Sequence, residues 1–355
     1  MVTNVMRMTP ERILIIRLSS MGDVILATPI FRQLRWRFPN AVIDLVIKSK
    51  FSELLETDPN LDHVITFEHT QGYSALVELR NLLAQQKYDL CIDLHRNLRS
   101  VYLRRIVPRR QRLLYARRRF RRWLYVHFRW NLFKSTPHVM DDYAAALKPL
   151  QITDDNLGPQ LTISGDKHET ARNLLRQRGV PAGVSYIVMA PGAGTATKCW
   201  TVDGFIECGR HLVAQDNCCL VIIGGMNDVA RCREIAEGIG ETAVTVAGEL
   251  SWSGTASVVQ DADGVICNDS WILHAAAAFN KKTVAVFGPT TAEMGYYPWS
   301  DQVEVVERAE NCRPCSHTGN ARCPKSHFRC MADISGAQVY HICKRHLLNI
   351  NAADQ

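Results

Sequence analysis

The stretch Arg12–Asp23, RILIIRLSSMGD, decides the fold of this chain. Its first seven residues form a short apolar run with the length of a buried strand, and Ser, Gly and Asp follow directly. The next segment, Val24–Phe38, has the spacing of a helix and ends before Pro39. A buried strand that leads through a tight turn into a helix predicts the start of a parallel α/β unit.

The same alternation continues along the chain and predicts two parallel sheets. In the first half we expect strands at 41–47, 63–67 and 88–94, and helices from about residue 52 and at 73–86. A polar stretch with Gly and Pro at 151–161 predicts a linker. Beyond it we expect strands at 186–189, 218–223, 243–246, 264–267 and 283–287, and helices at 168–179, 202–215 and 228–238. The pattern predicts two Rossmann-like, doubly wound domains, residues 1–160 and 161–355, that face a central cleft.

Ligands of such domains bind at the carboxyl ends of the strands, so the loops at those ends hold the candidate site residues. The first loop contains Ser20, Gly22 and Asp23. Gly22 allows a tight turn, and Ser20 or Asp23 can cap the helix that follows. The alternative to a plain cap is that Asp23 acts as a general base in the cleft.

Two loops of the second half have the composition of an anion site. Pro191–Lys198, PGAGTATK, lacks the spacing of a Walker motif, but its small residues and its final lysine suit a diphosphate as well as a plain surface turn. Asn268–Ala278 joins a strand to an Ala-rich helix, whose N-terminus offers free N–H groups. Asp269 and Ser270 can also simply cap that helix, and His274 can be a packed core histidine.

The basic residues are concentrated in one segment. Residues 96–134 contain fourteen Lys and Arg and no Asp or Glu. Removing these fourteen from the 42 basic residues leaves 28 against 35 acidic ones, so the rest of the chain is acidic although the net charge is +7. Aromatic residues alternate with the arginines. The segment therefore predicts a polyanionic partner, namely a phosphorylated substrate, an anionic membrane or nucleic acid, unless it is only a solvated helical face.

The remaining composition is that of a globular protein, with 46% hydrophobic and 22% charged residues. The N-terminus has no signal-peptide pattern, and no run approaches the roughly eighteen apolar residues of a spanning helix. We therefore expect a cytoplasmic protein. The cysteines Cys312, Cys315, Cys323 and Cys330 form a Cys-rich loop with His317 and His327 nearby. These side chains are plausible ligands of a structural zinc ion, but their spacing is looser than that of a typical zinc knuckle, so a loop without metal stays an alternative.

Together these motifs resemble glycosyltransferase family 9, the bacterial ADP-heptose:lipopolysaccharide heptosyltransferases, and the Cys-rich tail is closest to the heptosyltransferase II type. The matching motifs occur in the family's order over nearly the whole chain. They are RLSSMGDVILATPIFRQLR at 17–35, DLHRNLRS at 93–100, PGAGTATKCW at 191–200, GGMND at 224–228, AGEL at 247–250, NDSWILHAAAAF at 268–279, FGPT at 287–290 and CRPCSHTGNARCPKSHFRCM at 312–331.

The resemblance implies a GT-B fold whose N-terminal domain takes the acceptor and whose C-terminal domain takes ADP-heptose. By position, Asp23 matches the catalytic base and Lys198 the lysine that neutralises the donor diphosphate. The expected donor-binding residues are Lys198, Thr195, Thr197, Asp228, Asp269, Ser270, Trp271 and His274. The expected acceptor-binding residues are Ser20, Gly22, Arg96, Arg99, Arg117 and Arg118.

The resemblance implies an inverting transfer that needs no catalytic metal, with Asp23 as base and Lys198 stabilising the departing ADP. The acceptor would be the phosphorylated inner core of lipopolysaccharide on its lipid A anchor, which also gives the Arg-rich segment an anionic membrane partner at the cytoplasmic face of the inner membrane. One position departs from the family, because Trp271 stands where a Gly is usual. Because of this tryptophan, a donor other than ADP-heptose, such as another nucleotide-sugar, stays an alternative.

Other function classes explain less of the sequence. A nucleic-acid-binding protein would use the Arg-rich segment but leave the strand-end loops unexplained, so we expect no nucleic-acid partner. A dinucleotide-dependent dehydrogenase is disfavoured because no G-x-G-x-x-G follows the first strand.

Overall fold

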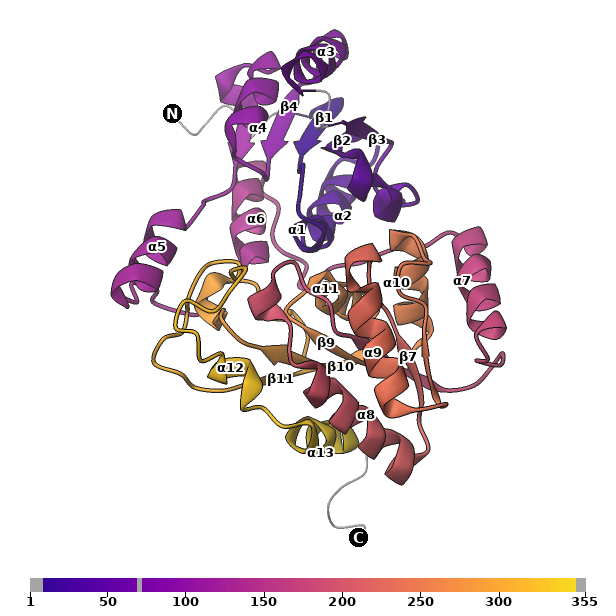
Figure 1. Ribbon diagram of the computed structural model, residues 1–355. Coiled ribbons are helices and arrows are strands. Elements are labelled where there is room, and N and C mark those ends of the chain that lie inside the picture. The colour runs from indigo at the N-terminus through magenta and orange to yellow at the C-terminus, as the bar shows by residue number, and fades with distance from the viewer. Residues whose placement is uncertain (1–8, 69–71, 349–355) are drawn as a thin grey trace. The chain divides into compact units, whose positions relative to one another are not determined.

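The computed structural model describes residues 9–68 and 72–348, and the chain divides into two compact units (Figure 1). The first unit contains the described residues up to Arg118 together with His138–Thr162. The second contains Arg119–Pro137 and the described residues from Ile163 onward. Each unit is built around its own parallel sheet, which confirms the predicted fold class of two Rossmann-like α/β domains.

The first unit has five parallel strands in the order β3-β2-β1-β4-β5. The central strand β1 is buried from Ile13 to Ile16 because strands and helices cover it on all sides. The strands are β1 (Arg12–Ile16), β2 (Val42–Lys48), β3 (His63–Phe67), β4 (Leu90–Asp93) and β5 (Arg112–Leu114). The helices are α1 (Met21–Ile25), α2 (Thr28–Arg37), α3 (Gly72–Gln85), α4 (Leu98–Leu103) and α6 (Val139–Leu147), with 3-10 turns η2 (Ser49–Leu55), η4 (Arg104–Ile106), η5 (Arg109–Gln111) and η6 (Lys148–Leu150).

The second unit has six parallel strands in the order β11-β10-β9-β6-β7-β8. The strands are β6 (Tyr186–Ala190), β7 (Cys219–Ile222), β8 (Ala243–Thr245), β9 (Gly264–Asn268), β10 (Lys282–Phe287) and β11 (Val303–Glu307). The helices are α5 (Arg119–Phe128), α7 (Gly165–Gln177), α8 (Val202–Asp216), α9 (Val229–Ile239), α10 (Trp252–Asp261), α11 (Trp271–Ala278), α12 (Arg329–Ala332) and α13 (Gly336–His346), with 3-10 turns η7 (Ala196–Lys198), η8 (Met226–Asp228) and η9 (Ala292–Met294).

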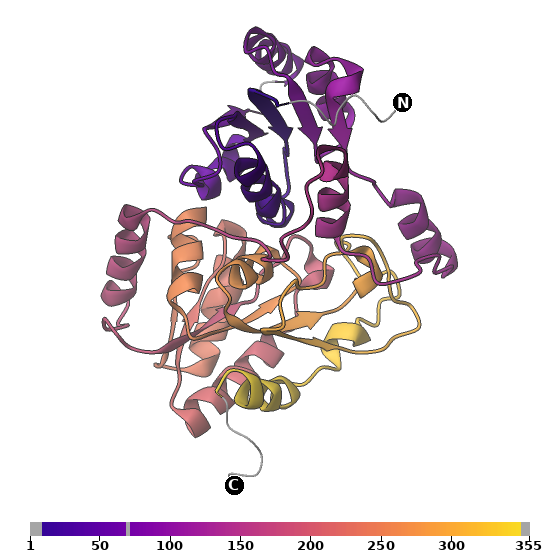
Figure 2. The same ribbon diagram turned by 180° about the vertical axis from the view of Figure 1, so that it is seen from behind.

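Alternate residues of β6 bury opposite faces of this second sheet. Ile187 and Met189 join a core with Phe205 of α8 and Val339 of α13. Val188 joins the core on the other face, with residues of α7, α10 and α11. Figure 2 shows these two layers of helices from behind. The period of two along a strand thus places one helical layer on each face, as in a doubly wound sheet.

The strand order reverses at one point in each sheet, and these points locate the candidate sites. In the first sheet β1 lies between β2 and β4, and in the second β6 lies between β7 and β9. In doubly wound sheets, ligands bind beyond the carboxyl ends of the strands at such a point of reversal. The predicted site loops follow β1, β4, β6 and β9.

Two predicted helices differ from those observed. The helix expected at 24–38 is divided into α1 and α2, and Pro29 lies in the first turn of α2. Proline has no N–H to continue the hydrogen bonding of a preceding helix, so a new helix begins there. The helix expected from about residue 52 is the 3-10 turn η2.

The Arg-rich segment is shared between the units, although we expected all of it in the N-terminal domain. Arg129, just after α5, donates hydrogen bonds to the carbonyl oxygens of Cys312 and Pro314 at 2.6 and 2.7 Å. Arg122 places its guanidinium over the ring of Tyr296, 5.5 Å from the centroid. These contacts attach residues 119–137 to the second unit. Within the described residues, no helix is long and apolar enough to cross a membrane.

Candidate active site

The loop after β1 presents Asp23 in a fixed position at the start of α1. The Asp23 carboxylate accepts hydrogen bonds from the Ser20 N–H at 3.1 Å and the Ser20 hydroxyl at 2.8 Å. It also forms an ion pair with Arg17, with 2.6 Å between Nη2 and Oδ1. Gly22 lies between Ser20 and Asp23 in sequence, within α1. The loop thus holds one carboxylate at the carboxyl edge of the first sheet.

The electrostatic balance keeps Asp23 ionised. Burial raises the pKa of the Asp23 carboxyl, but the Arg17 guanidinium and the hydrogen bonds from Ser20 outweigh burial, so the pKa is lowered overall. Arg17 is itself 4% exposed, and its Nη1 is hydrogen-bonded to the Leu94 carbonyl oxygen. Asp23 is therefore a carboxylate near neutral pH and can accept a proton.

His95 joins this group, and the sequence analysis did not select it. It follows β4, and its pKa is lowered to about 4 by burial and by the nearby Arg17 charge, although Asp93 and Asp23 act in the opposite direction. The imidazole is therefore neutral at physiological pH and lies within electrostatic reach of Asp23. The only signal in the sequence was its place in the DLHRNLRS motif at a predicted strand end.

The expected acceptor arginines have different environments. Arg96 has a left-handed backbone, with φ of 52°, and donates to the Tyr115 carbonyl oxygen at 2.7 Å. Arg117 in turn donates to the Arg96 carbonyl oxygen at 2.6 Å, and Arg118 is ion-paired with Asp142 at 2.7 Å. These three side chains therefore hold the loop structure together.

Arg99 belongs to a cationic cluster instead. The pKa of Lys48, at the end of β2, is lowered by partial burial and by the positive charges of Arg99 and Lys50. Arg99 and Lys50 thus lie close enough to disfavour the charge of Lys48. Such a cluster is electrostatically primed for a phosphorylated ligand.

In the second unit, the central contact of the site joins Lys198 to Asp269. Lys198 closes the loop after β6 and Asp269 follows β9, and 2.7 Å separates Nζ from Oδ2. Both side chains are largely buried, with 14% and 6% exposed. The Thr290 hydroxyl donates to the same Asp269 oxygen at 2.7 Å. A buried ammonium is therefore held at the point where the strand order reverses.

The N-terminus of α11 lies beside this ion pair. Ser270 is the N-cap residue, and its buried hydroxyl has no hydrogen-bond partner among the residues that the structure describes. A buried polar atom without a partner is costly, so it marks a place for a ligand. His274, one turn into α11, is 4% exposed. An ammonium, a helix N-terminus and an available hydroxyl together make this place a candidate anion site.

Asp228 and the glycine of the neighbouring loop fit closely together. Asp228 accepts a hydrogen bond from the Gly225 N–H at 3.0 Å. A Cβ atom on Gly192 would lie 2.5 Å from Asp228 Oδ2, which is too close for any side chain. The space beside Gly192 is therefore filled by the Asp228 carboxylate, and the loops after β6 and β7 depend on each other.

Thr195 and Thr197, expected to bind the donor, use their hydroxyls to hold the Cys-rich loop. Thr195 donates to the Thr318 carbonyl oxygen at 3.1 Å, and Thr197 donates to the Asn320 carbonyl oxygen at 2.9 Å. The Asn320 N–H returns a hydrogen bond to the Thr197 hydroxyl at 2.7 Å. Residues 318–320 therefore stabilise the loop that carries Lys198 through these hydrogen bonds.

Trp271 packs its ring against Trp252, with 5.2 Å between ring centroids in an edge-to-face arrangement. It joins the core on the α10 and α11 face of the sheet. The indole is thus held by protein contacts at the first position of α11.

Comparison with known proteins places this geometry in a family. The model of glycosyltransferase family 9 (heptosyltransferase) matches residues 76–325. The chain belongs to glycosyltransferase family 9. This match covers most of the chain, including the whole anion site of the second unit. The protein is therefore an enzyme that transfers a glycosyl group.

Individual family 9 proteins resemble the chain over most of their length. It is 26% identical to lipopolysaccharide heptosyltransferase 3 of Escherichia coli K12 over 292 residues, covering 79% of this chain and 83% of the relative. It is 26% identical to lipooligosaccharide heptosyltransferase 2 of Haemophilus influenzae over 315 residues, covering 84% and 89%. The solved structure of E. coli ADP-heptose lipopolysaccharide heptosyltransferase II superposes with a TM-score of 0.72 at 20% identity, covering 95% of this chain and 99% of that one. Its fold is that of the present chain, which confirms the GT-B class.

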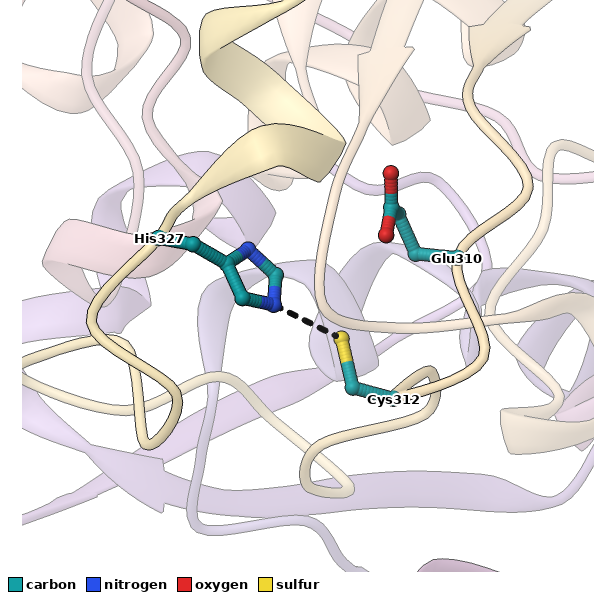
Figure 3. Close-up of side chains that lie close together, drawn as sticks. All are labelled: Glu310, Cys312 and His327. Carbon is teal, nitrogen blue, oxygen red and sulfur yellow. Dashed lines mark hydrogen bonds between the residues drawn. The ribbon is translucent and has the colours of Figure 1, made fainter.

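The Cys-rich loop of this family 9 enzyme holds a group of potential metal ligands that differs from the expected four cysteines. In the described part of the chain, the one set of three or more such atoms that lie within 4.8 Å of one another comes from Glu310, Cys312 and His327 (Figure 3). Cys315, Cys323 and Cys330 are free thiols outside this set. The sequence pointed to Cys312 and to His327 in this loop, but the spacing of the cysteines did not reveal that the Glu310 carboxylate lies beside them.

Proposed function

We propose that this enzyme transfers heptose from ADP-heptose to the phosphorylated inner core of lipopolysaccharide, with inversion of the anomeric centre. The observation that carries the proposal is the buried Lys198 ammonium beside the N-terminus of α11, with the Ser270 hydroxyl available. The names of the relatives, which are lipopolysaccharide and lipooligosaccharide heptosyltransferases, support the substrate class.

The donor diphosphate is proposed to bind Lys198 and the first N–H groups of α11. As the bond between the anomeric carbon and the diphosphate breaks, the electron pair leaves with ADP, and negative charge grows on its oxygen. A fixed ammonium and aligned N–H groups stabilise that charge without reorganisation, each worth about 3 kcal/mol in comparable sites. We propose that they make a catalytic metal ion unnecessary.

Asp23 is proposed to be the catalytic base. A sugar hydroxyl attacks poorly unless its proton is removed as the new bond to the anomeric carbon forms, and an ionised carboxylate can take that proton. The lowered pKa of Asp23, which results from Arg17 and Ser20 outweighing burial, ensures that the carboxylate is unprotonated at the start. Direct displacement by the hydroxyl inverts the anomeric configuration.

The acceptor phosphates are proposed to bind the cluster of Lys48, Lys50 and Arg99 at the carboxyl edge of the first sheet. Counter-charges from a bound phosphate would offset the partial burial and the repulsion from Arg99 and Lys50 that together lower the pKa of Lys48. Ser20 and Gly22, next to Asp23, would then border the reacting hydroxyl.

The helix α5 is proposed to rest on the anionic surface of the membrane that carries the acceptor, on its cytoplasmic side. Only Leu124 of this helix is buried, whereas Phe120, Trp123 and Phe128 are 70%, 43% and 53% exposed. Trp130, just beyond the helix, is 62% exposed. Aromatic rings between arginines are the composition of an interfacial helix, in which the rings enter the headgroup region and the cations pair with phosphates.

Calorimetric titration with ADP-heptose, UDP-sugars and GDP-sugars tests the donor, with Lys198→Ala as the control. We expect binding of ADP-heptose alone and its loss in the variant. Preference for another nucleotide-sugar would keep the fold and the mechanism but change the donor. Strongly salt-dependent binding of random oligonucleotides with no nucleotide-sugar binding would favour a nucleic-acid-binding protein and contradict the transferase proposal.

A further inference from the structure

The long Cys-rich loop contains potential metal ligands that have no role in the proposed transfer. Residues 308–328, between β11 and α12, form no helix or strand. Connections of this length without secondary structure are uncommon in compact domains unless something holds them. The same stretch contains the three ligand-type side chains that converge in Figure 3.

We propose that Glu310, Cys312 and His327 hold one zinc ion, which fastens the Cys-rich loop. The sulfur of Cys312 lies 3.7 Å from Nε2 of His327, and the Glu310 carboxylate lies within 4.8 Å of both. Thiolate, imidazole and carboxylate are the ligands that zinc takes in proteins. All three residues are half-buried, so an ion could reach the site and still be shielded.

A fourth ligand is available from the same turn. The thiol of Cys315 donates a hydrogen bond to the Cys312 carbonyl oxygen at 3.2 Å, and the two cysteines are spaced as in the C-x2-C turn of zinc sites. A bound cation would hold Cys315 as the thiolate, because the metal's charge stabilises a coordinating thiolate directly.

Two present contacts would change when the ion binds. Nδ1 of His327 accepts a hydrogen bond from the exposed Arg329 N–H at 3.1 Å, so Nε2 carries the ring proton in the neutral form. Ligation through Nε2 would put the ring proton on Nδ1 and break this hydrogen bond, which leaves the exposed Arg329 N–H to water. One Glu310 oxygen is paired with Arg308 at 3.0 Å, and the other oxygen remains for the metal.

The zinc ion would brace the candidate donor site without touching the donor. Between Cys312 and His327, the closed loop contains Thr318 and Asn320, which accept hydrogen bonds from Thr195 and Thr197, just before Lys198. Gly319, between them, has φ of +84° and lies so close that a Cβ there would be 2.0 Å from the Thr195 hydroxyl.

The Cys-rich loop also contacts the Lys198–Asp269 ion pair indirectly, through Thr290. Arg313 donates to the Thr290 carbonyl oxygen at 2.7 Å, and the Thr290 hydroxyl bonds Asp269. The metal would therefore position both partners of the Lys198–Asp269 pair. This consequence rests on the proposed donor site, whereas the metal site itself does not.

Metal analysis of the purified full chain, after dialysis against zinc and then against metal-free buffer, tests the proposal. We expect about one zinc per chain. Cobalt substitution should give the thiolate-to-metal charge-transfer band of a cysteine-ligated site. Cys312→Ser and His327→Ala should lose the ion, and Cys323→Ser, a half-buried thiol of the same loop, should keep it.

Each possible result bears on the proposal. A wild-type chain without stoichiometric zinc, or with another transition metal in its place, would overturn it. Loss of the ion in Cys323→Ser to the same degree as in Cys312→Ser would assign the site to the four cysteines instead. The cobalt band of the wild-type chain needs no variant, so a misfolded variant does not decide the matter. Zinc retained with no ADP-heptose binding would leave the metal site standing and contradict only the proposed donor.

Discussion

The ammonium of Lys198 lies 2.7 Å from the Asp269 carboxylate, and the two residues come from loops after β6 and β9, the two strands between which the strand order of the second sheet reverses. Before the donor binds, each side chain neutralises the other in a largely buried place. A diphosphate that enters must share the ammonium, so Asp269 acts as the group that keeps Lys198 aimed at the N-terminus of α11.

Replacement of Lys198 should impair the donor site more than replacement of Asp269. Lys198→Ala removes the cation and leaves the Asp269 carboxylate without its counter-charge, so we expect kcat to fall by about 10²–10³-fold. Asp269→Asn leaves the ammonium in place but less well positioned, so the loss should be smaller and mostly in KM. Steady-state kinetics on both variants measures the split. An Asp269→Asn enzyme as inactive as Lys198→Ala would show that Asp269 does more than position the lysine.

Two glycines of the same loop provide a matched pair of variants. Gly192→Ala places a Cβ 2.5 Å from the Asp228 carboxylate, whereas Gly194→Ala meets nothing within 4 Å. Displacement of the carboxylate should cost roughly 1–3 kcal/mol, as overpacking does. We expect a lower melting temperature and weaker donor binding for Gly192→Ala, and wild-type values for Gly194→Ala. Equal effects of the two substitutions would contradict the close fit of Asp228.

The pH dependence should follow the Arg17–Asp23 pair. A lowered folded pKa means that the Asp23 contribution to stability is present above its ordinary value of 3.8 and is lost as pH falls through the lower folded value. Arg17→Met removes the charge while burial remains, so the pKa of Asp23 should rise. The acid limb of kcat/KM should then move to higher pH, and Arg17→Lys should largely restore its position. An unmoved acid limb in Arg17→Met would argue against Asp23 as the base.

Asp23→Asn should abolish proton removal while the donor site stays intact. Loss of a general base typically costs about 10²–10⁴-fold in rate. We expect that loss in kcat with unchanged affinity for ADP-heptose by calorimetry. Near wild-type turnover of Asp23→Asn would require another base, and His95, with a pKa of about 4, is a neutral group within its electrostatic reach.

Membrane binding should depend on the aromatic rings around α5. Trp123→Ala combined with Trp130→Ala removes two exposed indoles, and Trp36→Ala, which is 84% exposed on α2, is the matched control. Cosedimentation with vesicles that contain anionic lipid should decrease for the double variant and stay unchanged for the control. Equal binding to neutral vesicles would contradict a role for the arginines.

Local patterns predicted the elements of this fold well, because a buried parallel strand and its helix are each recognisable over a few residues. The position of Asp23, Lys198 and Asp269 at the carboxyl edges of the sheets follows from that alternation. The partners of these residues could not be predicted. Lys198 meets Asp269, and Thr197 meets Asn320, across many residues of intervening chain, and no periodicity specifies which side chains meet between loops.

The Arg-rich segment shows the same limit on a larger scale. Its composition was evident from the sequence, but the attachment of α5 to the second unit depends on Arg129 meeting the carbonyl groups of Cys312 and Pro314. Every residue has a backbone carbonyl group, so the sequence does not show which carbonyl groups a given arginine will bind. The cysteine spacing likewise located a loop with potential metal ligands but not Glu310, which has no recognisable spacing to the cysteines.

The most direct measurement of the central claim is the product of a reaction that contains the enzyme, ADP-heptose and a phosphorylated inner-core acceptor. The account predicts that mass spectrometry shows the acceptor with one added heptosyl residue, that ADP is released in equal amount, and that NMR shows an anomeric configuration opposite to that of the donor. Hydrolysis of ADP-heptose without transfer, or a product that retains the donor configuration, would contradict it.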